Sequence, residues 1–134
     1  MKLSDFNIVK ASENTHTFAI VNPVTGEETD GLISIYGSES DVVRKFQAKQ
    51  LRKLQKKEFE NSRTRKQKFT ELEELRQTTL ENAVVRVAGW ENIEWEDEKL
   101  EFNEENARKV LKNCPWLCEQ IVEQSDDIGN FIKA

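Results

Sequence analysis

The sequence has little of the chemistry on which catalysis and metal binding usually depend. It contains one histidine, His16, and two cysteines, Cys114 and Cys118. A single imidazole offers little basis for acid–base catalysis or a zinc site, and two thiols are too few for a disulfide scaffold. We therefore expect a protein that is not an enzyme, binds no metal or cofactor, and keeps both cysteines packed and reduced.

Long apolar segments are also missing. No run of about 18 or more apolar residues occurs, so the sequence offers no candidate for a membrane-spanning helix. The first residues, 1–7, lack the apolar region of a secretory signal. Both observations lead us to expect a protein of the cytoplasm.

Charge, by contrast, is abundant and unevenly distributed. Of the 134 residues, 34% are charged and 37% are hydrophobic, and the formal net charge is −5. Residues 1–40 carry −4, residues 41–68 carry +8, residues 69–88 carry −2 and residues 89–134 carry −7. The hydrophobic fraction is below the usual value of about 45–50%. We interpret this as a small core whose burial is completed between chains.

The N-terminal unit, residues 1–37, reads as β structure. Residues 17–21 and 32–36 are short segments rich in β-branched and aromatic residues, and the Pro- and Gly-containing stretch 22–31 between them is typical of a hairpin loop. Residues 6–9 are a weaker candidate for a third strand. A lone hairpin is only marginally stable, so we expect this unit to pack on a helix or on another subunit.

Residues 38–88 are predicted to be a long charged helical region. Neither Gly nor Pro occurs in this range, and apolar residues recur at helical spacing in two stretches, starting at Val43 and at Phe69. Between the stretches, 61–64 has no large apolar residue. The pattern predicts helices over about 40–60 and 65–88, either broken near 61–64 or continuous, with Gly89 as the stop.

Residues 89–134 are predicted to be an acidic helical module. An aromatic and acidic connector, 90–95, precedes a helix over 104–112 with Asn103 as its N-cap. A second helix over 116–124 follows Pro115, and a short one ends near 131. The whole chain is therefore predicted to be one structural domain of the α+β class, mainly α: an N-terminal hairpin or small antiparallel sheet, then long helices, then a group of short helices.

The basic run within 44–68 is the strongest chemical signal. It contains eleven lysines and arginines, among which we single out Lys49, Arg52, Lys53 and Lys56 as candidates for partner contact. One interpretation is nucleic-acid binding through phosphates, but no aromatic residues alternate with these charges for stacking. The other is contact with acidic protein surface, either in the C-terminal third or in a neighbouring subunit, and we favour it.

Six apolar residues are candidates for self-association or partner binding. They are Phe46, Leu54, Phe69, Leu72, Trp90 and Trp116. Large aromatic residues close to helix starts often belong to the core, but aromatic residues also dominate binding hot spots. The sequence leaves open which of the six are core and which are interface.

Several short motifs give the chain a resemblance to a known family. The turn Asn-Pro-Val-Thr-Gly-Glu (22–27) is followed by Gly-Ser-Glu-Ser (37–40) at the start of the long helix. Gly89-Trp90, Phe102, Glu105-Asn106-Ala107, Leu111 and Pro115-Trp116 then form a G-W…F-x-x-E-N-A…L…P-W pattern. In this respect the chain resembles the tail assembly chaperones of long-tailed (siphovirus-type) bacteriophages and prophages.

The resemblance implies a non-enzymatic role. Such chaperones bind and solubilise the long tape-measure protein, help to recruit tail-tube subunits, and self-associate into rings or spirals. By this resemblance the protein acts in the host bacterial cytoplasm, has no catalytic residues, and is not part of the mature virion. Two alternatives stay open: a nucleic-acid-binding phage protein that uses the basic 44–68 helix, and a structural virion protein of the neck or of tail completion.

Overall fold

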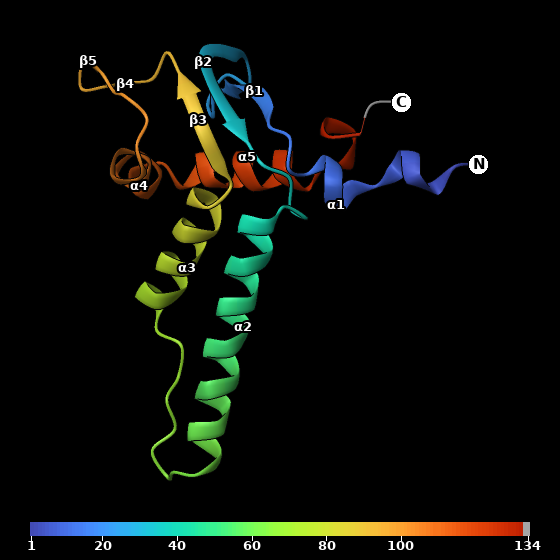
Figure 1. The fold of residues 1–134 in the computed structure, drawn as a ribbon. Coiled ribbons are helices and arrows are strands. Elements are labelled where there is room, and N and C mark those ends of the chain that lie inside the picture. Colours follow the sequence, from blue (N-terminus) through green and yellow to red (C-terminus); the bar gives the residue numbers. More distant parts are fainter. Residues whose placement is uncertain (133–134) are drawn as a thin grey trace.

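A three-stranded antiparallel sheet, in the order β1-β2-β3, forms the upper layer of the body in Figure 1, which draws the computed structural model; the structure describes residues 1–132. Its strands are β1 (His16–Val21), β2 (Glu28–Ile35) and β3 (Val87–Glu91). The first two strands confirm the predicted hairpin. The prediction of a strand over 6–9 is wrong, because the short helices η1 (Leu3–Phe6) and α1 (Ile8–Ala11) occupy that part of the chain.

Four longer helices and a small β ribbon complete the fold. The helices are α2 (Asp41–Ser62), α3 (Leu72–Val84), α4 (Glu104–Asn113) and α5 (Pro115–Asp126), and a short 3₁₀ helix, η2 (Ile128–Asn130), follows. The ribbon consists of β4 (Glu94–Trp95) and β5 (Glu98–Lys99). The prediction of a mainly α member of the α+β class is therefore confirmed.

The core lies between one face of the sheet and helices α3, α4 and α5. Period-2 alternation places Phe18 and Ile20 of β1 on the same face as Ile33 and Ile35 of β2, and all four are buried. The helices contribute Leu80, Ala83, Val84, Val110, Leu111, Leu117, Cys118 and Ile121, and Val87 of β3 and Ile93 complete the buried cluster. Figure 1 shows α5 crossing beneath the strands.

The two C-terminal helices form where their sequence signals predict them. The Asn103 side chain accepts a hydrogen bond from the backbone N–H of Asn106 at 2.7 Å, which is the expected N-cap of α4. Pro115 is the first residue of α5. Gln120 of α5 also ties this helix to the edge of β1, where its amide bonds the carbonyl of Val21 at 2.8 Å and the N–H of Val21 at 3.0 Å.

The prediction of a helix over 65–88 is wrong at both ends. Helix α3 begins at Leu72 and ends at Val84, and Val87–Glu91 is the third strand of the sheet. Gly89, predicted as a helix stop, lies in β3 opposite Ser34. The predicted region 38–88 is thus helical only over Asp41–Ser62 and Leu72–Val84. The helix ends early because the backbone N–H and C=O groups of β3 form hydrogen bonds with β2 instead of continuing the helix.

Candidate partner-binding arm

Helices α2 and α3 form an arm that projects from the body (Figure 1). Val43 near the start of α2 and Ala83 near the end of α3 are fully buried and anchor the arm in the body. The 22 residues of α2 give a helix of about 33 Å, because each residue adds about 1.5 Å. Most of that length lies beyond the core, so much of the arm's side-chain surface faces solvent.

The outer part of the arm exposes large apolar side chains. Six of them are more than half exposed: Leu51, Leu54, Phe59, Phe69, Leu72 and Leu75. Scattered exposed apolar residues are normal on a protein surface, but a group of this size on one projecting element indicates a contact surface for another molecule.

The two helices of the arm do not interlock through apolar residues. A groove of about 530 Å³ runs between them, and its lining is mostly polar: Gln50, Lys53, Leu54, Lys57, Thr70, Glu73, Glu74, Gln77 and Thr78. A second hollow of about 280 Å³ continues it toward the body, with Phe46 as its one large apolar residue. Leu54 is the one leucine among these lining residues.

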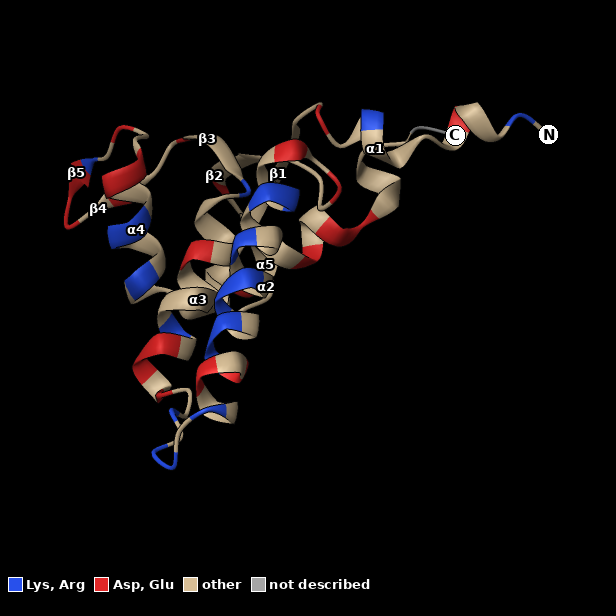
Figure 2. Ribbon diagram, turned by 60° about the horizontal axis from the view of Figure 1, so that its bottom comes forward, with Lys and Arg blue, Asp and Glu red and all other residues tan. Residues whose placement is uncertain are grey.

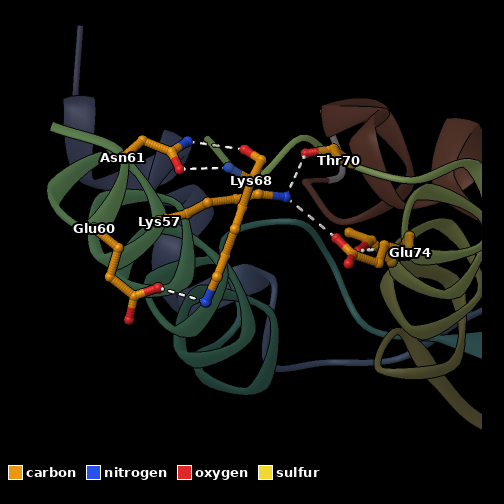
Figure 3. A network of polar contacts seen from close by, with 7 residues as sticks. Lys57, Glu60, Asn61, Lys68, Thr70 and Glu74 are labelled. Carbon is orange, nitrogen blue, oxygen red and sulfur yellow. Dashed lines mark hydrogen bonds and ion pairs between the residues drawn. The ribbon is translucent and has the colours of Figure 1, made fainter. Parts of the chain in front are cut away.

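Polar contacts hold the free end of the arm together (Figure 3). The Asn61 side chain bonds the backbone of Lys68 twice, at 2.6 and 2.8 Å. The ammonium group of Lys68 lies 3.0 Å from a carboxylate oxygen of Glu60, and this hydrogen bond and charge lower the pKa of Glu60. Lys57 joins the two helices through Glu74 at 3.4 Å. The loop 63–71 thus has a defined conformation without an apolar core of its own.

One face of α2 carries a continuous line of positive charge, which we name the basic ridge. It consists of Lys45, Lys49, Arg52, Lys53 and Lys56, all exposed and spaced so that they share one helix face. Lys45 pairs with Asp41 of its own helix at 2.8 Å, which raises the pKa of Lys45. Within residues 1–132 the other four ridge cations have no carboxylate within ion-pair distance.

A second charged surface, of opposite sign, surrounds the β4–β5 ribbon, and we name it the acidic rim. It consists of Glu91, Glu94, Glu96, Asp97, Glu98, Glu101, Glu104 and Glu105, all exposed. In the described part of the chain only Glu104 of this group forms an ion pair, with Arg108 at 2.9 Å. Figure 2 shows red segments around β4, β5 and the start of α4, and blue segments along α2 and the tip of the arm.

The predicted apolar candidates separate into two groups. Leu54, Phe69 and Leu72 lie exposed on the arm, and Phe46 lines the hollow nearer the body. Trp90 and Trp116 are instead half-buried against the core.

The indole N–H of Trp90 donates to the carbonyl of Leu100 at 2.9 Å, and its ring meets Phe102 edge to face at 5.2 Å. Both contacts hold the β4–β5 ribbon and the segment that follows it against β3. Phe59 was not among the predicted candidates, because it lies off the apolar stripe of α2; its exposure is visible only in the structure.

The root of the arm is fixed by a buried arginine. Arg86, between α3 and β3, is 3% exposed. Its guanidinium donates to the Ser125 hydroxyl at 3.1 Å and to the backbone and side-chain oxygens of Asn82 at 2.6 and 2.5 Å. Burial lowers the pKa of Arg86, and the charge of Asp126 opposes that shift. These bonds join α3, β3 and α5 at the point where the arm leaves the body.

The described residues bring together no group suited to metal chemistry or to thiol reactivity. No cluster of three or more His, Cys, Asp or Glu side chains that could hold a metal ion occurs in residues 1–132. Both cysteines are free, and burial raises the pKa of Cys118 to about 11 and also raises that of Cys114. In the same range no helix is long and apolar enough to span a membrane.

Comparison with protein families gives a match over residues 38–134, which is more than half of the chain, and its description is YdaY prophage protein. The chain belongs to this family. The matched range contains the arm, β3 and the C-terminal elements, whereas β1 and β2, which complete the sheet, precede it. No curated protein and no solved structure matches the chain. The expectation of a phage or prophage protein is therefore confirmed.

Proposed function

We propose that this prophage protein is a non-enzymatic tail assembly chaperone. It binds and solubilises the tape-measure protein in the host bacterial cytoplasm, helps to recruit tail-tube subunits, and leaves before the virion is mature. The observation that carries this proposal is the arm, whose large apolar side chains are exposed although the body has a packed core. Membership of a prophage family agrees with such a role but is less specific.

A protein that keeps a long apolar chain soluble must offer apolar surface for contact and charge for solubility. The arm offers both, because its exposed leucines and phenylalanines stand beside a strongly basic helix. Polar residues line the groove between its helices, so the two helices do not bury each other's apolar surface. Binding of the client would bury this exposed apolar surface.

The test is co-expression with the tape-measure protein encoded in the same prophage. We expect the wild-type chain to keep that protein in the soluble fraction and to co-purify with it. A variant with Leu51→Ser, Leu54→Ser, Leu72→Ser and Leu75→Ser should lose both effects while it keeps its own helical circular dichroism spectrum. Failure of the wild type to co-purify with soluble tape-measure protein would refute the proposal.

The matched control changes exposed apolar residues that lie outside the arm. Leu3, Val9 and Val24 are 76%, 46% and 90% exposed, and their replacement by serine should leave client solubility unchanged. If this control loses the client as completely as the arm variant does, the arm is not the binding surface. Detection of the chain in purified virions by mass spectrometry would favour a structural neck or tail protein instead.

A further inference from the structure

The basic ridge continues into an aromatic ring and an arginine at the free end of the arm. Four of the five ridge residues, from Lys45 to Lys56, follow one another at alternating intervals of four and three residues, and the same intervals lead on to Phe59 and Arg63. Residues at these intervals share one face of a helix. The guanidinium of Arg63 lies over the Phe59 ring, 5.2 Å from its centre. One helix face therefore carries cations and an exposed ring in a single line.

This line of residues corrects the expectation that no aromatic residue alternates with the basic run. Phe59 is 60% exposed and stands between Lys56 and Arg63 on the same face. Phe46 also lies within the run, but it is partly buried and lines the hollow between the two helices. A second exposed ring, Phe69 at 73%, directly follows Lys68 at the free end. The end of the arm thus presents two rings to solvent beside its cations.

Positive charge on the outer part of the arm is largely unpaired. Residues 49–68 contain nine lysines and arginines but only two glutamates. Within residues 1–132, Lys57 and Lys68 each pair with a carboxylate, and the other seven cations have none within ion-pair distance. Concentrated charge of one sign attracts ligands of the opposite sign. This surface therefore favours an extended, negatively charged partner.

A shallow hollow of about 550 Å³ opens beside the Phe59 ring. It is lined by Phe59, Glu60, Arg63, Thr64, Lys66 and Lys68. The Lys68–Glu60 ion pair and the two hydrogen bonds between Asn61 and Lys68 hold the loop that forms its wall (Figure 3). Because this loop already has a defined conformation, little ordering entropy is lost when a ligand binds there. The hollow offers a flat ring for stacking and cations next to it.

We propose that the basic ridge and the tip of the arm bind single-stranded nucleic acid, with a base stacked on Phe59 and phosphates along the cations. Proteins that hold single strands combine a basic track for the backbone with aromatic rings for the bases. The track from Lys45 to Arg63 extends over about 27 Å of helix. The acidic rim repels a polyanion, so the strand contacts the arm and not the β4–β5 ribbon.

Other negatively charged partners fit this surface less well. A membrane surface requires apolar side chains at the leading end of the arm, yet residues 61–68 contain none. An acidic protein would pair with the cations but has no particular use for an aromatic ring over another apolar side chain. A DNA duplex keeps the faces of its bases within the stack, so it would leave Phe59 unused. A single strand is the partner that uses both the cations and the ring.

The nucleic-acid surface is separate from the apolar surface proposed for the client. Successive helical residues are turned by about 100°, so Leu51 and Leu54 lie on the side of α2 opposite to the basic ridge. The four-leucine variant described above should therefore bind a single strand as the wild type does. A variant that lacks ridge and tip cations should still keep the tape-measure protein soluble. Failure of one proposal would thus leave the other standing.

The test measures binding of the full chain to labelled oligonucleotides by fluorescence anisotropy. Oligo(U) RNA and oligo(dT) DNA of about 12 nucleotides are compared with a duplex of the same length, and the tighter of the two strands identifies the natural source. We expect both single strands to bind more tightly than the duplex at about 50 mM salt, and binding to weaken steeply as salt rises to about 500 mM.

Substitutions of Phe59 test the stacked base. Phe59→Leu keeps an exposed apolar side chain but removes the ring, so it should weaken binding of the strands about fivefold or more. Phe59→Tyr keeps the ring and should bind as the wild type does. A partner that needs only apolar surface, such as an acidic protein, would not distinguish leucine from phenylalanine at this position.

A triple variant tests the cations. It carries Arg52→Gln, Lys56→Gln and Arg63→Gln. Each phosphate contact to a single strand contributes about 0.7 to the slope of log K against log salt, so the triple variant should lower that slope by about two. The matched control removes three exposed cations that lie outside the arm, with Lys99→Gln, Lys109→Gln and Lys112→Gln. This control should bind as the wild type does.

Several results would overturn the inference, provided that each variant keeps the circular dichroism spectrum of the wild type. These are a wild type that binds neither strand at about 50 mM salt, a duplex that binds more tightly than both strands, a matched control that loses as much affinity as the triple variant, and unchanged binding by Phe59→Leu. Tighter binding of polyglutamate or of phosphatidylserine vesicles than of either strand would assign the surface to an acidic protein or to a membrane.

Discussion

Replacing Leu54 by alanine should leave the protein almost as stable as before, although the leucine lies on the apolar stripe of a helix. Leu54 is 51% exposed, whereas Ile121 in α5 is 0% exposed. Full burial of a side chain of this size stabilises by about 1.5–3 kcal/mol, and a cavity in the core adds to the cost of removing it. We therefore expect Leu54→Ala to lower the free energy of unfolding by about 0.5–1 kcal/mol, and Ile121→Ala by about 3 kcal/mol.

Urea unfolding followed by circular dichroism at 222 nm measures both changes, with a common slope for the free energy against urea concentration. The protein should be kept at low concentration, so that no other molecule covers the arm. If Leu54→Ala then costs as much as Ile121→Ala, Leu54 is buried within the single chain. In that event the arm is part of the core, and its use as a binding surface is wrong.

Three further predictions concern the root of the arm, its tip and the thiols. Arg86→Ala should lower the free energy of unfolding by about 3 kcal/mol, because it deletes a buried charged group together with the hydrogen bonds that this group makes. Arg86→Met fills the same space without burying a charge, so it should cost less. Urea unfolding of both variants tests this. The pKa of Glu60 lies below its ordinary value of 4.5 through Lys68, so this pair stabilises the fold above that pH and the contribution is lost as pH falls through the lowered pKa. An NMR titration of the Glu60 carboxyl should show its pKa rise toward 4.5 in Lys68→Gln, and an unchanged titration would contradict the contact. Cys118, with a pKa of about 11, should react with a thiol reagent at pH 8 only as fast as the protein unfolds; rapid labelling would contradict its burial.

The sequence predicts the elements that local signals define, and it misses a strand that depends on a distant partner. Asn103 and Pro115 are local signals, and α4 and α5 begin where those residues place them. Strand β3 has no such signal, because Val84 and Val87 continue the helical spacing of α3. Its conformation is determined by pairing with β2, where Ile33 lies opposite Trp90. Residue propensities along the chain carry no information about a pairing partner that is so remote in sequence.

The arm illustrates the same limit for the candidate site. The spacing of Leu54, Leu72 and Leu75 indicates apolar helix faces, but a face buried in its own fold has the same spacing as one left open for a partner. Only the structure separates Leu80, which is buried, from Leu75 five residues earlier, which is exposed. The distribution of charge, in contrast, could be counted directly from the sequence, and the structure adds where the two signs lie.

The attachment of the arm has a consequence for how the protein can change over time. Ile35 at the end of β2 is the register partner of Val87 at the start of β3, so both ends of the arm leave from adjacent points of the sheet. The arm is therefore an insertion between neighbouring strands, and the entropy of closing such an insertion rises only slowly with its length. Matched turns can be added to or removed from α2 and α3 without disturbing the body beneath. The reach of the arm can thus evolve separately from the scaffold that carries it.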